Sequence, residues 1–300
     1  MRNNLFAVLR AAVLAGVCAA CAAPATPSPA PGPALFVARD ADSTLYIYGT
    51  IHIRRAGEPW GSPSVEAALA ASDEIWTELE ISPTNDALTQ QLATQLGAAP
   101  AGRGLSTWLS PEQAQRLAQT ARRLGLSAQA LEPMQPWLAG LVLALIPVVR
   151  AGYDPGAGVD RAIDAYGDAN GKRMRAFETP AQQIGFLAEL APDVQLQMLL
   201  EAIDETEAGP AALDEMSAAW ERGELEVLER LLNQEMRRDY PEMYAALITA
   251  RNNAWVATLL DELQDSGVDF VAVGAAHMVG EGGLVAQLRA RGVAVERVTR

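Results

Sequence analysis

Segments typical of β-strands lie near both ends of this chain, and a long stretch of helical pattern separates them. The apolar and β-branched runs 34–40 and 43–51, joined by the polar residues 40–43, predict a hairpin. Further strands are predicted at 73–81, 172–178, 268–277 and 293–298, with helices at 62–72 and 281–292. Strands that alternate with helices favour an α/β fold with a mostly parallel or mixed central sheet flanked by helices. The helical stretch, 85–263, predicts a large insertion between the N-terminal and C-terminal strands.

One part of this helical stretch is strongly apolar. Residues 137–149, WLAGLVLALIPVV, carry no charge. A membrane-spanning helix needs about 20 such residues, and Pro147 is expected to break this helix near its end. The segment is therefore predicted to be a buried core helix.

The amino-terminal residues resemble an export signal. A basic start precedes an apolar run that ends in small residues, and VCAAC, residues 17–21, resembles a bacterial lipobox. We expect a signal peptide of the lipoprotein type at 1–21, a Pro/Ala-rich linker at 22–33 and a single domain at 34–300. Lipidation of Cys21 would anchor the protein to the membrane, as an outer-membrane lipoprotein facing the periplasm. The alternative is cleavage at an Ala-x-Ala-like site, which would give a soluble periplasmic protein.

Composition excludes several classes of function. Both cysteines, Cys18 and Cys21, lie in the leader, so the domain has no disulfide, zinc–thiolate site or cysteine nucleophile. The formal net charge is −14. Because nucleic-acid binding depends on neutralising phosphates with basic side chains, an acidic chain argues against a nucleic-acid partner.

The chain has two histidines, and both occur in the same setting. His52 in YIYGTIHI and His277 in VAVGAAHM each follow an apolar run, a glycine and two further residues. A histidine after a strand often only caps a turn or fills the edge of a core. In open α/β sheets, however, ligands bind at the carboxyl ends of the strands, where glycine permits close approach. If the two strands are neighbours, both imidazoles face one site.

Carboxylates follow other predicted strands. Glu78 and Glu80 lie at the end of 73–81, on the same predicted face as Trp76, and Glu178 ends 172–178. Imidazole and carboxylate ligands together suit zinc, manganese, iron or cobalt. The alternative is that these glutamates belong to a solvated face.

Five blocks of the chain are distinctive in sequence and in order: YIYGTIHI, SVEAALAASDEIWTELEIS, GVDRAIDAYGDANGKRMRAFETPAQQ, ITARNNAWV and VAVGAAHMVGEGGLVAQLRARGVAVERV. In this order they resemble the TraB/PrgY/GumN family, which is related to the Tiki metalloproteases. The resemblance implies a fold similar to erythromycin esterases and ChaN-like haem-binding lipoproteins. It implies a shared site at His52, Glu78, Arg251 and His277, with Glu178 as a weaker candidate.

Two classes of function follow as hypotheses. The first is a metal-dependent hydrolase, a peptidase in which His52, Glu78 and His277 hold Mn, Co or Zn. Arg251 would stabilise an oxyanion or orient a substrate carboxylate. A metal-free variant would use one histidine as general base, assisted by Glu78. The second class is a binding protein that sequesters a peptide or small ligand in the same crevice, and a haem or iron carrier is a third possibility.

Overall fold

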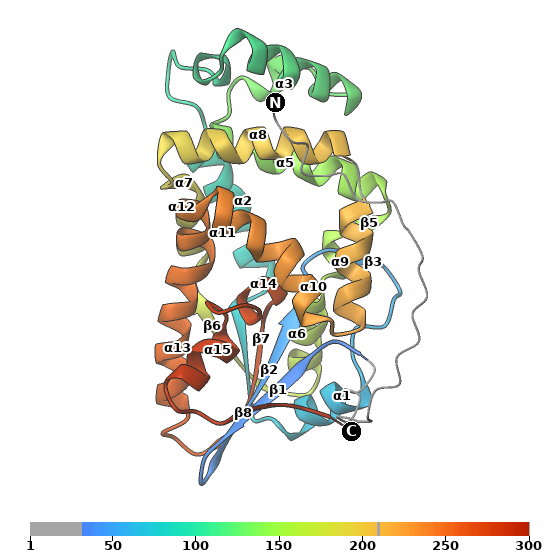
Figure 1. Ribbon diagram of the computed structural model, residues 1–300, viewed down its shortest axis with the longest axis vertical. Coiled ribbons are helices and arrows are strands. Elements are labelled where there is room, and N and C mark those ends of the chain that lie inside the picture. Colours follow the sequence, from blue (N-terminus) through green and yellow to red (C-terminus); the bar gives the residue numbers. More distant parts are fainter. Residues whose placement is uncertain (1–31, 209–210, 300) are drawn as a thin grey trace, which may run out of the picture.

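A computed structural model describes residues 32–208 and 211–299, so the leader, Cys21 and most of the linker lie outside the described residues. A six-stranded sheet forms the centre of the molecule (Figure 1). Its strands, in chain order, are β1 (Leu35–Arg39), β2 (Ser43–Thr50), β4 (Glu74–Leu79), β6 (Arg173–Glu178), β7 (Gly267–Gly274) and β8 (Val295–Arg297). The strands β3 (Arg54–Arg55) and β5 (Tyr153–Asp154) form a separate two-stranded pair.

The strand order across the sheet is β6-β4-β7-β2-β1-β8. The first four strands in this order run parallel, and β1 pairs antiparallel with both β2 and β8. The predicted mixed α/β fold, with its hairpin and helical insertion, is therefore confirmed. In the register of the sheet, Thr50 at the end of β2 lies opposite Gly274 at the end of β7. The two glycine–histidine segments consequently leave neighbouring parallel strands at the same edge.

Helices surround the sheet, and several begin with the same local signal. Ser62, Ser82, Ser110 and Thr179 each cap a helix whose first residue is proline, which satisfies free N–H groups of the first turn. The α-helices are α1 (Pro63–Ala71), α2 (Pro83–Leu96), α3 (Pro111–Arg123), α4 (Ala128–Leu131), α5 (Pro136–Arg150), α6 (Val159–Ala169), α7 (Pro180–Ala188), α8 (Pro192–Ala208), α9 (Ala211–Glu221), α10 (Leu225–Glu229), α11 (Glu235–Asp239), α12 (Pro241–Tyr244), α13 (Ala250–Glu262), α14 (Ala275–Met278) and α15 (Leu284–Ala290).

Short helical segments of other types complete the described part of the chain, and the following counts refer to that part. Two are 3₁₀ helices, η1 (Leu105–Trp108) and η2 (Pro155–Ala157). Two are π-helical, η3 (Arg230–Gln234) and η4 (Ala245–Thr249). Each π segment joins two α-helices without a break, so α10 to α11 and α12 to α13 form two long helices with a widened turn inside. Such turns are rare and frequently occur at functional sites.

The core has two principal parts. One lies on the sheet, with helices α13 and α15 on one side and α1 and α6 on the other (Figure 1). The second lies in the insertion, where α3, α5 and α8 pack beyond the carboxyl ends of the strands. Gly140 allows α5 to approach α8 closely, because an added Cβ would lie 3.3 Å from the backbone of Leu199.

The apolar segment 137–149 lies in α5, and it differs from the prediction in two ways. Trp137, Ala139, Gly140 and Leu143 are buried, but Leu141, Leu145 and Val149 are exposed. The cause is that α5 packs on α8 along one face only. Pro147 does not end the helix, which continues to Arg150. Within the described ranges, none of the helices combines the length and apolar character needed to cross a bilayer.

Candidate functional site

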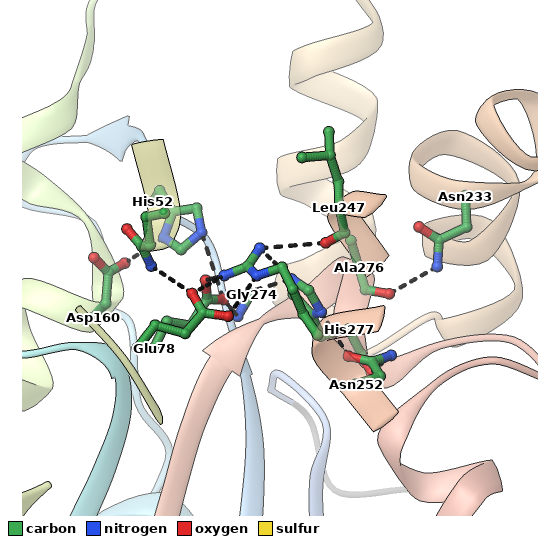
Figure 2. A network of polar contacts seen from close by, with 12 residues as sticks. His52, Glu78, Asp160, Asn233, Leu247, Asn252, Gly274, Ala276 and His277 are labelled. Carbon is green, nitrogen blue, oxygen red and sulfur yellow. Dashed lines mark hydrogen bonds and ion pairs between the residues drawn. The ribbon is translucent and has the colours of Figure 1, made fainter. Parts of the chain in front are cut away.

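The predicted site residues converge at the carboxyl edge of the parallel strands (Figure 2). Glu78 lies in β4, at the centre of the group. Figure 2 shows His52 and Asp160 on one side of this carboxylate, and His277 with Asn252 on the other. His52 follows β2, and His277 lies in the short helix α14 that follows β7. The structure therefore brings together side chains that are more than 200 residues apart in the chain.

Glu78 connects the two imidazoles. Its Oε1 accepts a hydrogen bond of 2.7 Å from the N–H of Gly274, and its Oε2 accepts one of 2.6 Å from Arg251. The Nε2 atoms of His52 and His277 each lie 3.9 Å from Oε1. Burial alone raises the pKa of Glu78, but the two imidazoles and the guanidinium outweigh that effect and lower the pKa to about 2. Glu78 is therefore ionised.

Arg251, the second residue of α13, uses all of its N–H donors inside the protein. Nε and Nη2 donate to the two oxygens of Glu178 at 2.7 and 2.8 Å, and Nη2 also donates to Glu78. Nη1 donates to the carbonyl of Leu247 at 3.3 Å and to Nε2 of His277 at 3.1 Å. These contacts account for the five donors of a guanidinium. In this arrangement Arg251 has no N–H left to offer an oxyanion.

His277 is buried and held in one tautomer. Its Nδ1 lies 2.6 Å from Oδ1 of Asn252, while the amide nitrogen of Asn252 donates to the carbonyl of Gly282 at 2.7 Å. Since the amide nitrogen is used elsewhere, the oxygen faces the ring and Nδ1 carries the proton. Burial lowers the pKa of His277 to about 4, and its side chain is only 5% exposed. Neutral His277 thus presents the Nε2 lone pair to the site.

His52 lies at the open side of the site, with 56% of its side chain exposed. Its Nδ1 is 3.1 Å from Oδ1 of Asp160, in the first turn of α6. Loss of bulk water lowers the pKa of His52, while the hydrogen bond with Asp160 and the charge of Glu78 raise it, and the net shift is upward. Asp160 also orients the ring so that Nε2 points toward Glu78.

Glycines permit the close approach of these elements. An added Cβ on Gly274 would lie 3.1 Å from both Oε1 of Glu78 and Nε2 of His52, so the gap between these atoms exists because residue 274 has no side chain. Gly158, which precedes α6, would place a Cβ 2.5 Å from the carbonyl oxygen of His52. The N–H of Val159 donates to the carbonyl of Ile51 at 2.9 Å, which fixes Asp160 beside the ring.

Comparison with known proteins identifies the family of this chain. The model of the TraB/PrgY/gumN family matches residues 34–297. The chain belongs to this family. It is 24% identical over 257 residues to the protein YbaP of Escherichia coli K12, described as uncharacterized, covering 86% of this chain and 92% of that protein. A YbaP protein of Shigella flexneri matches with the same identity and coverage. No solved structure matches the chain.

Two residues of the candidate site were not predicted from the sequence. Asp160 and Asn252 each hold the Nδ1 of one histidine. Asn252 is adjacent to Arg251 in RNN, and Asp160 lies in the block GVDRAID, but neither spacing indicates a histidine partner. Among the candidates, Glu178 joins the site through Arg251, whereas Glu80 is exposed and follows the end of β4 at Leu79.

The π-helical segments also support the site. Asn233 in η3 donates to the carbonyl of Ala276 at 2.7 Å, next to His277 (Figure 2). Leu247 in η4 supplies the carbonyl that binds Nη1 of Arg251. A π turn contains an extra residue, which changes the direction of the side chains that follow it. Both widened turns therefore position the polar network.

The donors of the site suit a metal ion. His52, His277 and Glu78 provide two imidazoles and a carboxylate, a combination found in catalytic zinc sites. Ligands held at about 2.1 Å by one tetrahedral ion stand about 3.4 Å apart, compared with the 3.9 Å separations at Oε1. No three His, Cys, Asp or Glu side chains of the described chain already have metal-binding spacing. The types of donor suit an ion, but in this structure their spacing is too wide for one ion to bind all three, so the imidazoles would have to move closer.

Proposed function

We propose that this protein is a metal-dependent hydrolase that cleaves peptides, with His52, Glu78 and His277 as the ligands of a Mn, Co or Zn ion. The observation that carries the proposal is the convergence of two imidazole Nε2 atoms on one oxygen of an ionised carboxylate. The proposed place of action, the bacterial cell envelope, rests on the export-type leader, either through a lipid on Cys21 or as a free periplasmic protein.

The charges at the site favour a bound cation. Glu78, Glu178 and Asp160 contribute three carboxylates, and Arg251 contributes one positive charge. The raised pKa of His52 adds a second positive charge near pH 7, which leaves one negative charge. An ion that bound Nε2 would displace the proton of His52, so that two negative charges would face the ion. A metal ion bound there would supply Lewis acidity and a water of lowered pKa. His52, being exposed, is the ligand nearest to an arriving substrate.

The other polar residues hold these ligands in place. Asp160 and Asn252 fix the Nδ1 side of each ring, so both rings direct Nε2 into the site. Arg251 holds the two glutamates and is assigned a positioning role here, since its donors are all used. To bind an ion, His277 must give up the hydrogen bond that its Nε2 accepts from Arg251.

Metal titration and peptide hydrolysis together test the proposal. Purified protein is titrated with Mn²⁺, Co²⁺ and Zn²⁺ by calorimetry, and cleavage of a mixed peptide library is followed by mass spectrometry with and without chelator. We expect one bound ion and cleavage that stops on chelation. His52→Ala and His277→Ala should each abolish both, and the double variant should be no worse, because the ligands act as a unit.

Gly274→Ala is the sharpest variant. Its added methyl group would enter the gap between His52 Nε2 and Glu78 Oε1, while the φ of −52° at this residue suits alanine. We expect loss of metal binding and hydrolysis in a folded protein, and Glu80→Gln, on an exposed carboxylate, serves as the control. The proposal fails if the protein binds no transition metal and the histidine variants retain full hydrolysis.

One observation favours a second candidate, a binding protein without turnover. All five donors of Arg251 and both oxygens of Glu78 are already engaged, as in a rigid recognition site. This candidate predicts that some peptides of the library bind saturably, remain intact and still bind after chelation. The same mass-spectrometric experiment, read for retained rather than cleaved peptides, distinguishes the two.

A further inference from the structure

A second polar feature lies at the opposite edge of the sheet, away from the histidines. A hollow of about 500 Å³ opens at the amino ends of β4, β6 and β7 and the carboxyl end of α13. Asp269 in β7 lines it, five residues before Gly274, which corresponds to about 17 Å along a strand. The hollow is therefore separate from the candidate active site, although β7 contributes to both.

Asp269 is a buried carboxylate that has no partner among the residues that the structure describes. It is 9% exposed, and its neighbours across the sheet are Leu45 on one side and Glu74 on the other. Its side chain makes no hydrogen bond or ion pair with any described residue, in contrast to Glu78. An unpaired buried carboxylate is costly. Its position on the wall of the hollow leaves its oxygens available to a ligand.

The charges around Asp269 are unbalanced. Arg173 and Arg175, on β6, both pair with the same carboxylate, Glu74, and Arg175 does so at 2.8 Å. Four further carboxylates line the hollow: Asp73, Glu262, Asp265 and Asp269. Five carboxylates against two guanidinium groups leave three negative charges. The side chain of Arg173 is 66% exposed and that of Arg175 is 47% exposed, so both arginines lie at the rim.

The spacing of these carboxylates favours a cation with several separated charges over a single metal ion. Within the part of the chain that the structure describes, no three acidic side chains converge at metal-binding distance. The volume of the hollow instead falls in the range of about 300–1,000 Å³ that is typical of small-molecule sites. Carboxylates dispersed around such a space suit a ligand that carries several separated positive charges, because each ammonium group donates up to three hydrogen bonds.

We propose that this hollow binds a small aliphatic polyamine, with Asp269 as the buried anchor for one ammonium group. The carboxylates of Glu262 and Asp265, at the end of α13 and just beyond it, bind the other ammonium groups. The carboxyl end of a helix adds partial negative charge that favours cations there. This site is independent of the proposed hydrolase activity.

Calorimetric titration of the full chain with spermidine tests the site, in buffer with NaCl at physiological ionic strength and excess MgCl₂ to suppress non-specific attraction. We expect saturable binding of one spermidine per chain. Asp269→Asn keeps the shape and removes the charge, and it should weaken binding about tenfold or more. Glu80→Gln removes one negative charge at the other edge of the sheet and should bind as the parent does.

A change in the opposite direction strengthens the test. Arg175→Gln removes a competing positive charge from the rim, so it should tighten spermidine binding. Circular dichroism of each variant verifies the fold, and Asp269→Asn is expected to remain folded because it removes an unpaired charge. Absence of spermidine binding to the parent protein, or equal binding by Asp269→Asn, would overturn the proposal.

Discussion

Buried carboxylates occur at both edges of the parallel strands, but among the described residues they are paired with a cation at one edge and not at the other. At the carboxyl edge, Glu78 and Glu178 are buried, and each accepts charge-assisted hydrogen bonds from Arg251. At the amino edge, Asp269 is as buried as Glu78 but has no donor among the described residues. Internal pairing fixes the geometry of the first group and lowers the pKa of Glu78, whereas burial without pairing raises the pKa of Asp269 to about 6. The glutamates at the carboxyl edge thus form a preorganised network with Arg251, whereas the carboxylate of Asp269 remains free to bind the proposed ligand.

Removing the central cation of the carboxyl edge should have the largest effect. Arg251→Met leaves two buried carboxylates without their partner, which should lower the free energy of unfolding by about 3–5 kcal/mol. Urea denaturation measures the change. Arg161→Met provides the control, because Arg161 pairs with Asp86 on the surface, where loss of an ion pair costs at most about 1 kcal/mol.

A second substitution tests whether the cost arises from unpaired charge. Arg251→Met leaves the buried carboxylates of Glu78 and Glu178 without their partner. Adding Glu178→Gln removes one of these two unpaired charges, so the double variant should be more stable than Arg251→Met alone. If Arg251→Met costs no more than Arg161→Met, the carboxyl edge is not held by this network, and the contrast between the two edges disappears.

The amide that holds His277 should have the next largest effect. Asn252→Leu deletes the hydrogen bonds to Nδ1 of His277 and to the carbonyl of Gly282, which should destabilise the protein by about 1–3 kcal/mol. The neighbouring Asn253 is exposed, so Asn253→Leu is a control of identical chemistry. Nitrogen NMR of the His277 ring should show a fixed Nδ1–H tautomer in the parent and a mixture in Asn252→Leu. A ring unaffected by Asn252→Leu would contradict the assigned role.

The unpaired carboxylate of Asp269 at the amino edge should make the stability of the protein depend on pH. Burial, followed by the charges of Glu262, Glu74 and Asp73, raises the pKa of Asp269 from 3.8 to about 6, against the opposing charge of Arg175. Between these values the folded protein binds more protons than the unfolded chain, so this group makes stability fall as pH rises from 3.8 to about 6. Above that range Asp269 is ionised at a net cost.

Asp269→Asn should remove this part of the pH profile. We expect the variant to be more stable than the parent at pH 7, by up to about 2 kcal/mol. The difference should shrink toward zero below pH 3.8, the unshifted pKa of an aspartate, where the parent residue is also neutral. Urea denaturation at several pH values provides the measurement, and a stability difference that does not vary with pH would argue against an unpaired carboxylate.

Sequence patterns predicted much of the fold and the acidic and basic centre of the site. Strand periodicity located β2, β4 and β7, and the matching glycine–histidine segments predicted one shared site for His52 and His277 if their strands were neighbours, which they are. The partners Asp160 and Asn252 could not be found in this way, because their contacts depend on how α6 and the π turn before α13 pack on the sheet. Tertiary contacts of this kind leave no fixed spacing in the chain.

Dependence on tertiary contacts also explains why the sequence did not predict the exposed face of α5 or the unpaired carboxylate of Asp269. The apolar run 137–149 predicted burial, yet only the partner α8 determines which face of α5 is covered. Asp269 lies in a run with the apolar pattern of a buried strand. Whether its side chain meets a donor depends on the residues that β2, β4 and the end of α13 place around it, and the sequence alone does not show these neighbours. Alternation in β4 predicted Glu78 and Glu80 on the face of Trp76. Glu78 is buried in the strand, but Glu80 is exposed because the strand ends at Leu79.

Glu80 provides the smallest effect and completes the comparison. It is exposed, so Glu80→Gln should change the free energy of unfolding by no more than about 0.5 kcal/mol. Its charge does act on Asp164 in α6, whose pKa is raised to about 6 mainly by burial, then by Asp168, and in smaller part by Glu80. Glu80→Gln should therefore lower the pKa of Asp164 only slightly, as measured by carboxyl-carbon NMR, because burial remains. Glu78→Gln should leave that pKa unchanged while it removes the carboxylate that both imidazoles approach. If Glu80→Gln instead proved the more damaging of the two for metal binding or hydrolysis, the strand-end carboxylate of the site would be Glu80, and the paired network at the carboxyl edge would be structural only.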